Sequence, residues 1–309
     1  MRNTIVAACL IAALFSFGCN KKKKKTAPPP PELAVTLIDR GDAPFESLRY
    51  AIAPDTVVRS ILEIRTADQT PGRTVQSRNT FGVLPGFRLV LRAGPTTLQP
   101  KGARYVLRVS KAESILPEGV TERETAEVER GIQVLRGMRG RFDLNEQGIV
   151  IDADVPWAQG QERIHPRVAI TIGNVRSAIA TIPLPKEPVG VGAIWEVRRP
   201  VRIWSARVTQ VIRYQLTDLA GDRFRVSVTV DQTAQPQVAD LNPKLEMHVR
   251  SYEMHANGHA LGDLGLPLAV EASLESTSFA DIALVSPEET EPLTSSRRSL
   301  LRLVSRAEN

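Results

Sequence analysis

The chain has few cysteines, which excludes a fold held together by disulfide bonds. Only two occur in 309 residues, at positions 9 and 19. Cys9 lies in an N-terminal apolar segment that we expect to be removed, so one thiol remains in the mature chain. Small exported domains use disulfide bonds to compensate for a small core. A chain of roughly 280 remaining residues buries enough apolar surface to fold without them.

The sequence also lacks a basic surplus beyond its first 25 residues. The whole chain carries 40 Lys and Arg against 34 Asp and Glu. Arg2 and the five lysines at positions 21–25 account for the excess, and all 34 acids follow residue 26. The rest of the chain therefore has zero formal charge. Domains that bind nucleic acid carry a basic surplus, so we expect no nucleic-acid partner.

No stretch of the chain carries a known catalytic motif. There is no G-x-S-x-G, no H-E-x-x-H and no catalytic-cysteine signature, and GVGAIW lacks the third glycine of a dinucleotide site. His248, His255 and His259 are close in sequence. However, Asn257-Gly258 is typical of a two-residue hairpin turn, which would place His255 and His259 on opposite faces. We therefore predict no metal site, no cofactor and no enzymatic activity.

The sequence does contain a tripartite N-terminus. A positive start is followed by an unbroken apolar run over residues 5–17, IVAACLIAALFSF. The run is too short to span a bilayer as a helix, but it suits a secretory signal peptide. Ser16 and Gly18 are small residues at the third and first positions before Cys19, where signal peptidase requires them. We predict a signal peptide over residues 1–18 and export of the remainder.

The Ser-Phe-Gly-Cys sequence that ends at Cys19 resembles the lipobox of bacterial lipoproteins. In that family the signal is cut just before the cysteine, so the resemblance implies that Cys19 becomes the lipidated first residue. The family usually has leucine where this chain has Ser16, and ordinary cleavage after Gly18 would instead release a soluble protein with a free Cys19. Asn20 stands where an aspartate retains lipoproteins at the inner membrane. The resemblance therefore implies an anchor in the outer membrane rather than the inner one, with the globular part in the periplasm or at the cell surface.

The residues after the cysteine suit a membrane tether. Five consecutive lysines come first: Lys21, Lys22, Lys23, Lys24 and Lys25. They would lie within a Debye length of the lipid headgroups, where each lysine contributes about 1 kcal/mol at an anionic surface. Pro28–Pro31 then favour an extended spacer of about 3 Å per residue. We predict that residues 19–34 are a lipidated tether between the membrane and the folded body.

Beyond the tether, apolar and polar residues alternate with period two, which is typical of half-buried antiparallel strands. The turn residues Asp218–Asp222 join two such segments into a hairpin, and residues 142–155 (FDLNEQGIVIDADV) read as another. The segments with this alternation are 86–93, 104–110, 206–216, 222–231, 268–276 and 299–305.

Two helices are expected among these strands. Thr121 and Glu124 form a capping box before apolar residues at helical spacing, and a second apolar stripe follows His165-Pro166 and extends to Ile182. The sequence therefore predicts a mainly β, α+β fold: a strongly curved antiparallel sheet or half-barrel with two helices packed on its concave side. Residues 35–182 and 193–309 would form two strand-rich halves packed as one unit.

At the level of the fold, this expectation is similar to the half-barrel carriers related to lipoprotein localisation factors. Those proteins bind acyl chains between a curved sheet and helices, so the similarity implies a non-enzymatic module for a lipid or other hydrophobic ligand. The alternative is a structural or assembly lipoprotein that docks another envelope component through outward-facing arginines.

Replacing the predicted lipid-bearing residue tests the location. In cells that carry Cys19→Ala, we expect the protein to move from the membrane fraction to the soluble periplasm, because no acyl chains would be attached. Mass spectrometry of the mature N-terminus reports the cleavage site and the acyl mass of the unmodified sequence. A mature chain that begins elsewhere, or that carries no added hydrocarbon, would contradict the prediction.

Overall fold

The computed structural model describes nine stretches of the chain. They are residues 34–68, 86–100, 102–116, 121–133, 135–154, 181–203, 206–242, 245–287 and 290–308. Within these stretches the chain is mainly β, and 14 strands form one large antiparallel sheet.

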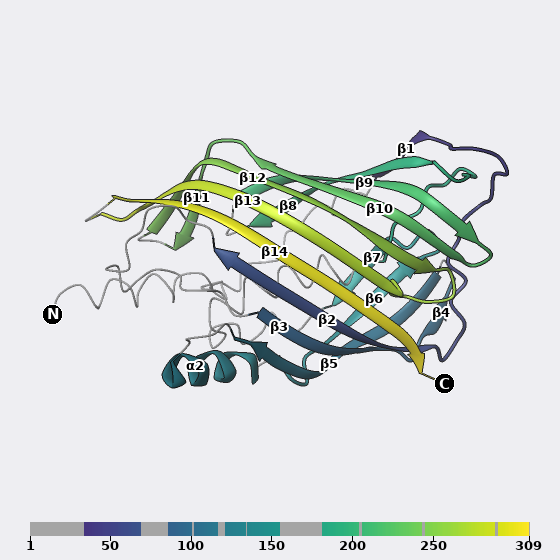
Figure 1. The fold of residues 1–309 in the computed structure, drawn as a ribbon, viewed down its shortest axis with the longest axis horizontal. Coiled ribbons are helices and arrows are strands. Elements are labelled where there is room, and N and C mark those ends of the chain that lie inside the picture. The colour runs from purple at the N-terminus through teal and green to yellow at the C-terminus, as the bar shows by residue number, and fades with distance from the viewer. Residues whose placement is uncertain are drawn as a thin grey trace, which may run out of the picture.

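The strands lie in two groups along the chain, with a helix within the first (Figure 1). The elements of the first group are β1 (Ala34–Asp39), β2 (Val57–Asp68), β3 (Gly86–Ala93), β4 (Thr97–Gln99), β5 (Gly102–Ile115), α2 (Glu122–Gln133), β6 (Arg139–Asn145) and β7 (Val150–Asp154). Those of the second group are β8 (Ile194–Ile203), β9 (Ala206–Ala220), β10 (Arg223–Ala234), β11 (Gln237–Asn242), β12 (Leu245–Asp263), β13 (Glu271–Val285) and β14 (Thr290–Glu308).

The sheet is open, and the last strand of the chain joins its two groups. The strand order is β1-β8-β9-β10-β12-β13-β14-β2-β3-β5-β6-β7, with β11 added beside β12 and β4 beside β5. The groups are connected by two antiparallel pairings. One is β1 with β8 at the edge of the sheet. The other is β14 with β2 in its interior, which runs from Arg297 opposite Asp68 to Glu308 opposite Val57. Residues from the two ends of the chain are therefore neighbours in the middle of the sheet.

The alternating segments of the sequence are strands, as their period predicts. In β10 the side chains of Phe224, Val226 and Val230 are buried, while those of Arg223 and Arg225 are exposed. The predicted hairpin of β9 with β10 is confirmed, and so is the hairpin of β6 with β7. Alternation gives every strand an inner face toward the core and an outer face toward solvent.

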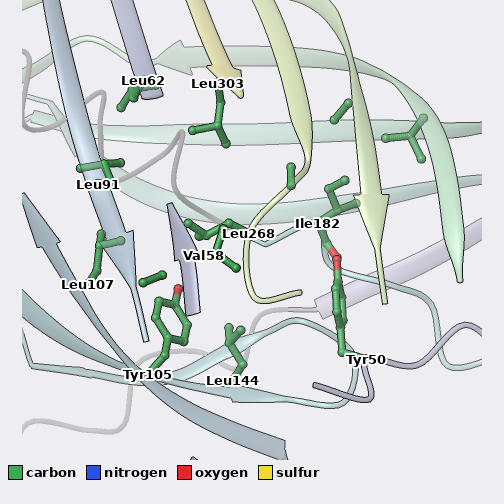
Figure 2. Close-up of a cluster of buried hydrophobic side chains, with 14 of the residues drawn as sticks. Tyr50, Val58, Leu62, Leu91, Tyr105, Leu107, Leu144, Ile182, Leu268 and Leu303 are labelled. Atoms are coloured by element: carbon green, nitrogen blue, oxygen red, sulfur yellow. The ribbon is translucent and has the colours of Figure 1, made fainter. Parts of the chain in front are cut away.

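Three connecting segments pack against the inner face and fill the space within the curved sheet. They are residues 46–52, 181–189 and 264–269, and each contributes buried apolar side chains to the main core. The Tyr50 hydroxyl donates a hydrogen bond to the Ile182 carbonyl at 3.1 Å. Figure 2 shows these two residues on one side of the cluster, with strand residues on the other. We call these three stretches the inner segments.

The predicted helix after Thr121 is present as α2. It contacts β5, and Ile132 near its end is buried in the main core together with Leu135. Within the described stretches, no helix is long and apolar enough to cross a membrane. The second predicted helix was expected to run from near His165 to Ile182. All of this range up to residue 180 lies outside the described part of the chain, and Thr181 and Ile182, which are described, are not helical.

The predicted hairpin turn at Asn257-Gly258 is wrong. Both residues lie in the middle of β12, which pairs with β10 on one side and with β13 on the other. A Cβ atom on Gly258 would lie 1.9 Å from the Ser273 carbonyl oxygen. This glycine therefore permits a close approach of two strands, and pairing on both sides overrides the local turn preference of the dipeptide.

Adjacent residues of β2 test the assignment of the two faces. Leu62 has no exposed surface, whereas Ile61 is 44% exposed on the opposite face. We expect Leu62→Ala to lower the free energy of unfolding by about 2–5 kcal/mol, because it leaves a cavity in the main core. Ile61→Ala should cost less than about 1 kcal/mol. Urea unfolding of both variants measures the difference, and equal costs would contradict the assignment.

Candidate functional site

The residues predicted for the membrane anchor lie before the described part of the chain, which begins at Ala34. Gly18 and Cys19 therefore keep their predicted roles in cleavage and lipidation without a structural position. The same holds for the five lysines predicted to contact the membrane surface: Lys21, Lys22, Lys23, Lys24 and Lys25. The folded body must supply any further site, and its inner and outer faces carry different chemistry.

The three histidines of β12 lie on the outer face, each beside a carboxylate of its own. His255 and His259 share this face, so the prediction that they point to opposite faces is wrong. Nδ1 of His255 lies 2.8 Å from Asp231, and Nε2 of His248 lies 2.9 Å from Glu246. Among the described residues, no three metal-binding side chains are close enough to share an ion.

A row of polar side chains crosses the inner face, which is otherwise apolar. The row crosses six neighbouring strands, β8, β9, β10, β12, β13 and β14, and each position lies directly opposite the next. In that order the positions are 199, 210, 232, 254, 278 and 297. Met254 occupies one position, and the Tyr252 hydroxyl reaches into the row from the same strand. We call this group the polar band; it consists of Arg199, Gln210, Gln232, Tyr252, Ser278 and Arg297.

Hydrogen bonds join members of the polar band in pairs. Nε of Arg199 donates to Oε1 of Gln210 at 2.6 Å, and the Tyr252 hydroxyl donates to Oε1 of Gln232 at 3.0 Å. Gln210 is only 2% exposed and Gln232 only 8%. Buried amides are costly unless their hydrogen bonds are made. Each glutamine uses its carbonyl oxygen in these pairs, so its amide NH2 group is available to a ligand oxygen.

Burial also sets the ionisation state of the band's tyrosine. Loss of hydration raises the pKa of Tyr252 to about 12, although the positive charge of Arg297 opposes this shift. The hydroxyl therefore stays protonated at physiological pH and acts as a hydrogen-bond donor. No member of the band is a carboxylate, an imidazole or a thiol. The band can thus recognise polar oxygen atoms by hydrogen bonding and by the charge of its two arginines.

Apolar side chains flank the polar band on both sides. On β9, Tyr214 and Leu216 belong to the main core on one side of Gln210, and Ala206 belongs to a second cluster on the other. This second apolar cluster consists of Ala206, Ala239, Met247, Val249, Ala280 and Ile282. The second cluster is itself buried, since each of its members is at most 7% exposed, and it places apolar side chains directly beside the band.

A cavity of about 460 Å³ lies beside α2, away from the polar band. Its lining includes Arg88, Glu113, Glu129 and Arg136, together with the buried Ile132. Most of the lining residues are polar or charged, so this cavity does not match the apolar cavity expected for a hydrophobic ligand.

The polar band was not predicted from the sequence, although the sequence contains a signal for it. Gln210 and Gln232 stand at positions where the period-two alternation of β9 and β10 places inward side chains. Glutamine at an inward position departs from the apolar pattern and could have been noticed. That both glutamines fall in one row with Arg199 and Arg297 depends on strand register, which the local sequence does not reveal.

Comparisons with known proteins identify no family for the chain. It matches no protein-family model, and no curated protein sequence matches it at a significant level.

The tyrosines predict how stability depends on alkaline pH. Burial raises the pKa of all four, Tyr50, Tyr105, Tyr214 and Tyr252, above the ordinary value of 10.0. In the unfolded chain they lose protons near pH 10, while the folded chain keeps them, so stability should fall as pH rises above 10. Urea unfolding at increasing pH measures this, together with tyrosinate absorbance. Tyrosinate absorbance that grows near pH 10 while the fold is intact would contradict the prediction.

Proposed function

We propose that the protein is an exported, lipid-anchored binding protein of the bacterial envelope, and that the inner face of its sheet holds an amphiphilic ligand. The polar head of the ligand would contact the polar band, and its apolar part would lie on the second apolar cluster. We propose that the lipid on Cys19 anchors the protein in the outer membrane rather than in the inner membrane. The proposal also includes a half-barrel with two helices on its inner side.

The observation that carries the proposal is the polar band itself. A sheet face that only has to pack a core is apolar, and a buried amide in it lowers stability unless its hydrogen bonds are made. Two nearly buried glutamines and two arginines in one row are therefore unexpected for packing alone. Positions that depart from the rules of packing are often positions of function.

The second apolar cluster favours an amphiphile over a purely polar ligand. Methyl and thioether groups of Met247, Val249 and Ile282 lie on the same inner face, beyond the band. Met side chains adapt to irregular apolar partners. A ligand with a polar head and a short apolar tail would match both surfaces. We propose binding rather than a reaction because the band has no carboxylate, imidazole or thiol, and burial raises the pKa of its one titratable hydroxyl, Tyr252, to about 12, far from the neutral range that suits an acid–base catalyst.

Two substitutions in the polar band test the proposal with dodecanoate as the probe. The double variant Gln232→Leu with Tyr252→Phe removes both partners of one hydrogen bond, so neither is left unpaired. We expect its affinity for dodecanoate to fall at least about fivefold, which corresponds to about 1 kcal/mol for one lost hydrogen bond. Isothermal titration calorimetry of the full chain measures the affinity.

The control variant carries the same kind of change on the opposite face. Gln215 is exposed on the outer face of β9, so Gln215→Leu should leave the affinity unchanged. Thermal unfolding shows whether each variant is folded. The proposal is contradicted if the unmodified protein does not bind dodecanoate, or if the control variant loses as much affinity as the double variant.

The alternative function, docking of another envelope component, is favoured by a separate observation on the outer face. Arginines on that face form a row across neighbouring strands. The chemistry of this row indicates which class of envelope component it would bind.

A further inference from the structure

Five arginines lie in direct register across five adjacent strands of the sheet. Arg306 of β14 lies opposite Arg59 of β2, and Arg59 lies opposite Arg92 of β3. Arg92 lies opposite Arg108 of β5, and Arg108 lies opposite Arg139 of β6. Figure 1 shows β14, β2, β3 and β5 side by side. We call this row the arginine ladder.

All five arginines of the ladder are exposed on the outer face. Arg92 pairs with Glu308 at 2.7 Å. Among the described residues, the other four have no ion pair. Neighbouring strands lie about 4.8 Å apart, so the row is roughly 19 Å long. Like charges directly opposite each other on a sheet destabilise it, which means that folding alone does not favour this arrangement.

The ladder is a local feature of a body whose formal charges balance. Four residues further along β14, β2 and β3, and five along β5, the outer face carries the row Arg302, Glu63, Arg88 and Glu113, in which the signs alternate. In that row Glu63 accepts hydrogen bonds from Arg88 and Arg65. Burial is the largest single influence on the pKa of Glu63 and raises it, but the hydrogen bonds and positive charges of Arg65 and Arg88 together hold the pKa below its usual value. In the ladder, by contrast, only Arg92 has an ion pair among the described residues.

An aliphatic row separates these two charged rows. Val304 lies opposite Ile61, and Ile61 lies opposite Val90. Val304 is 48% exposed and Ile61 is 44% exposed. Val90 is only 9% exposed, and the next position of the row is Lys111 of β5. The outer face therefore offers a line of guanidinium groups with two exposed aliphatic side chains, Val304 and Ile61, beside it.

We propose that the arginine ladder binds a linear carboxylated polysaccharide. Guanidinium groups bind carboxylates through paired hydrogen bonds. A polymer of sugar acids repeats a carboxylate along a chain whose rings also have apolar C–H faces. The carboxylates would contact the ladder, and the ring faces would lie over Val304 and Ile61. This proposal concerns the outer face and does not rest on ligand binding at the inner face.

Two other anionic partners fit the ladder less well. Adjacent strands in a sheet are rotated by about 20–25°, so four steps turn the row by roughly 80–100°. Five guanidinium groups on such a row cannot all contact a flat membrane, whereas a flexible polymer can follow them. Proteins that bind single-stranded nucleic acid stack bases on aromatic side chains. The row beside the ladder, Val304, Ile61, Val90 and Lys111, contains no aromatic side chain, which favours a sugar polymer.

The test compares two triple variants of the full chain for binding to polygalacturonate. The ladder variant carries Arg59→Gln, Arg108→Gln and Arg306→Gln. The control variant carries Arg198→Gln, Arg207→Gln and Arg225→Gln, which removes three exposed arginines of the same outer face on β8, β9 and β10. Both variants keep the five lysines of the tether, so the contribution of these lysines to binding cancels in the comparison.

We expect the ladder variant to bind polygalacturonate at least about tenfold more weakly than the unmodified protein, with a less steep dependence on salt, because fewer counterions are released. The control variant should bind within about twofold of the unmodified protein. The melting temperature of the ladder variant should be unchanged or higher, because like-charge repulsion is relieved. If it does unfold, the single variants Arg108→Gln and Arg306→Gln provide the same comparison.

Three outcomes would overturn the proposal. The first is equal weakening in the ladder and control variants. The second is tighter ladder-dependent binding to oligothymidylate, which would indicate a nucleic acid. The third is tighter ladder-dependent binding to phosphatidylglycerol vesicles, which would indicate a membrane. A result on dodecanoate leaves this test unaffected, because the ladder variant changes no residue of the inner face.

Discussion

The structure depends on the packing of the three inner segments between the two ends of an open sheet. The amide of Ala51 donates to the Leu264 carbonyl, and the amide of Leu184 donates to the Gln147 carbonyl, both at 2.8 Å. The first bond joins the inner segments 46–52 and 264–269. The second bond joins the inner segment 181–189 to the turn between β6 and β7. Buried backbone groups need such partners. The inner segments therefore hold the sheet in a curve and supply apolar side chains that the sheet alone could not bury.

The local pattern of the sequence predicts the strands because a strand face has a period of two residues. Phe224, Val226 and Val230 could be assigned to the inner face without any knowledge of their neighbours. The same reasoning predicted the hairpin of β6 with β7. It also indicated an α-helix after Thr121, since capping residues and helical spacing are local features too.

The features that define both candidate surfaces could not be predicted in the same way, because they depend on pairing between distant residues. Arg59 and Arg306 are near opposite ends of the chain, and only the pairing of β2 with β14 brings them together. At Asn257-Gly258 the local preference for a turn was misleading, since strands on both sides keep β12 extended. Register is set by the whole sheet, so a row across strands emerges only from the fold.

The two surfaces differ in how firmly the core supports them. Each arginine of the ladder on β2, β3 and β5 stands next to a deeply buried residue of the main core, such as Val58, Leu91 or Leu107. Close packing fixes these strands, so the spacing of the guanidinium groups is set before a ligand binds, which reduces the entropy lost on binding. The polar band instead lies between the main core and a smaller cluster. An extended, rigid row suits a repeating polymer, whereas a polar band next to a small apolar cluster suits a single amphiphile.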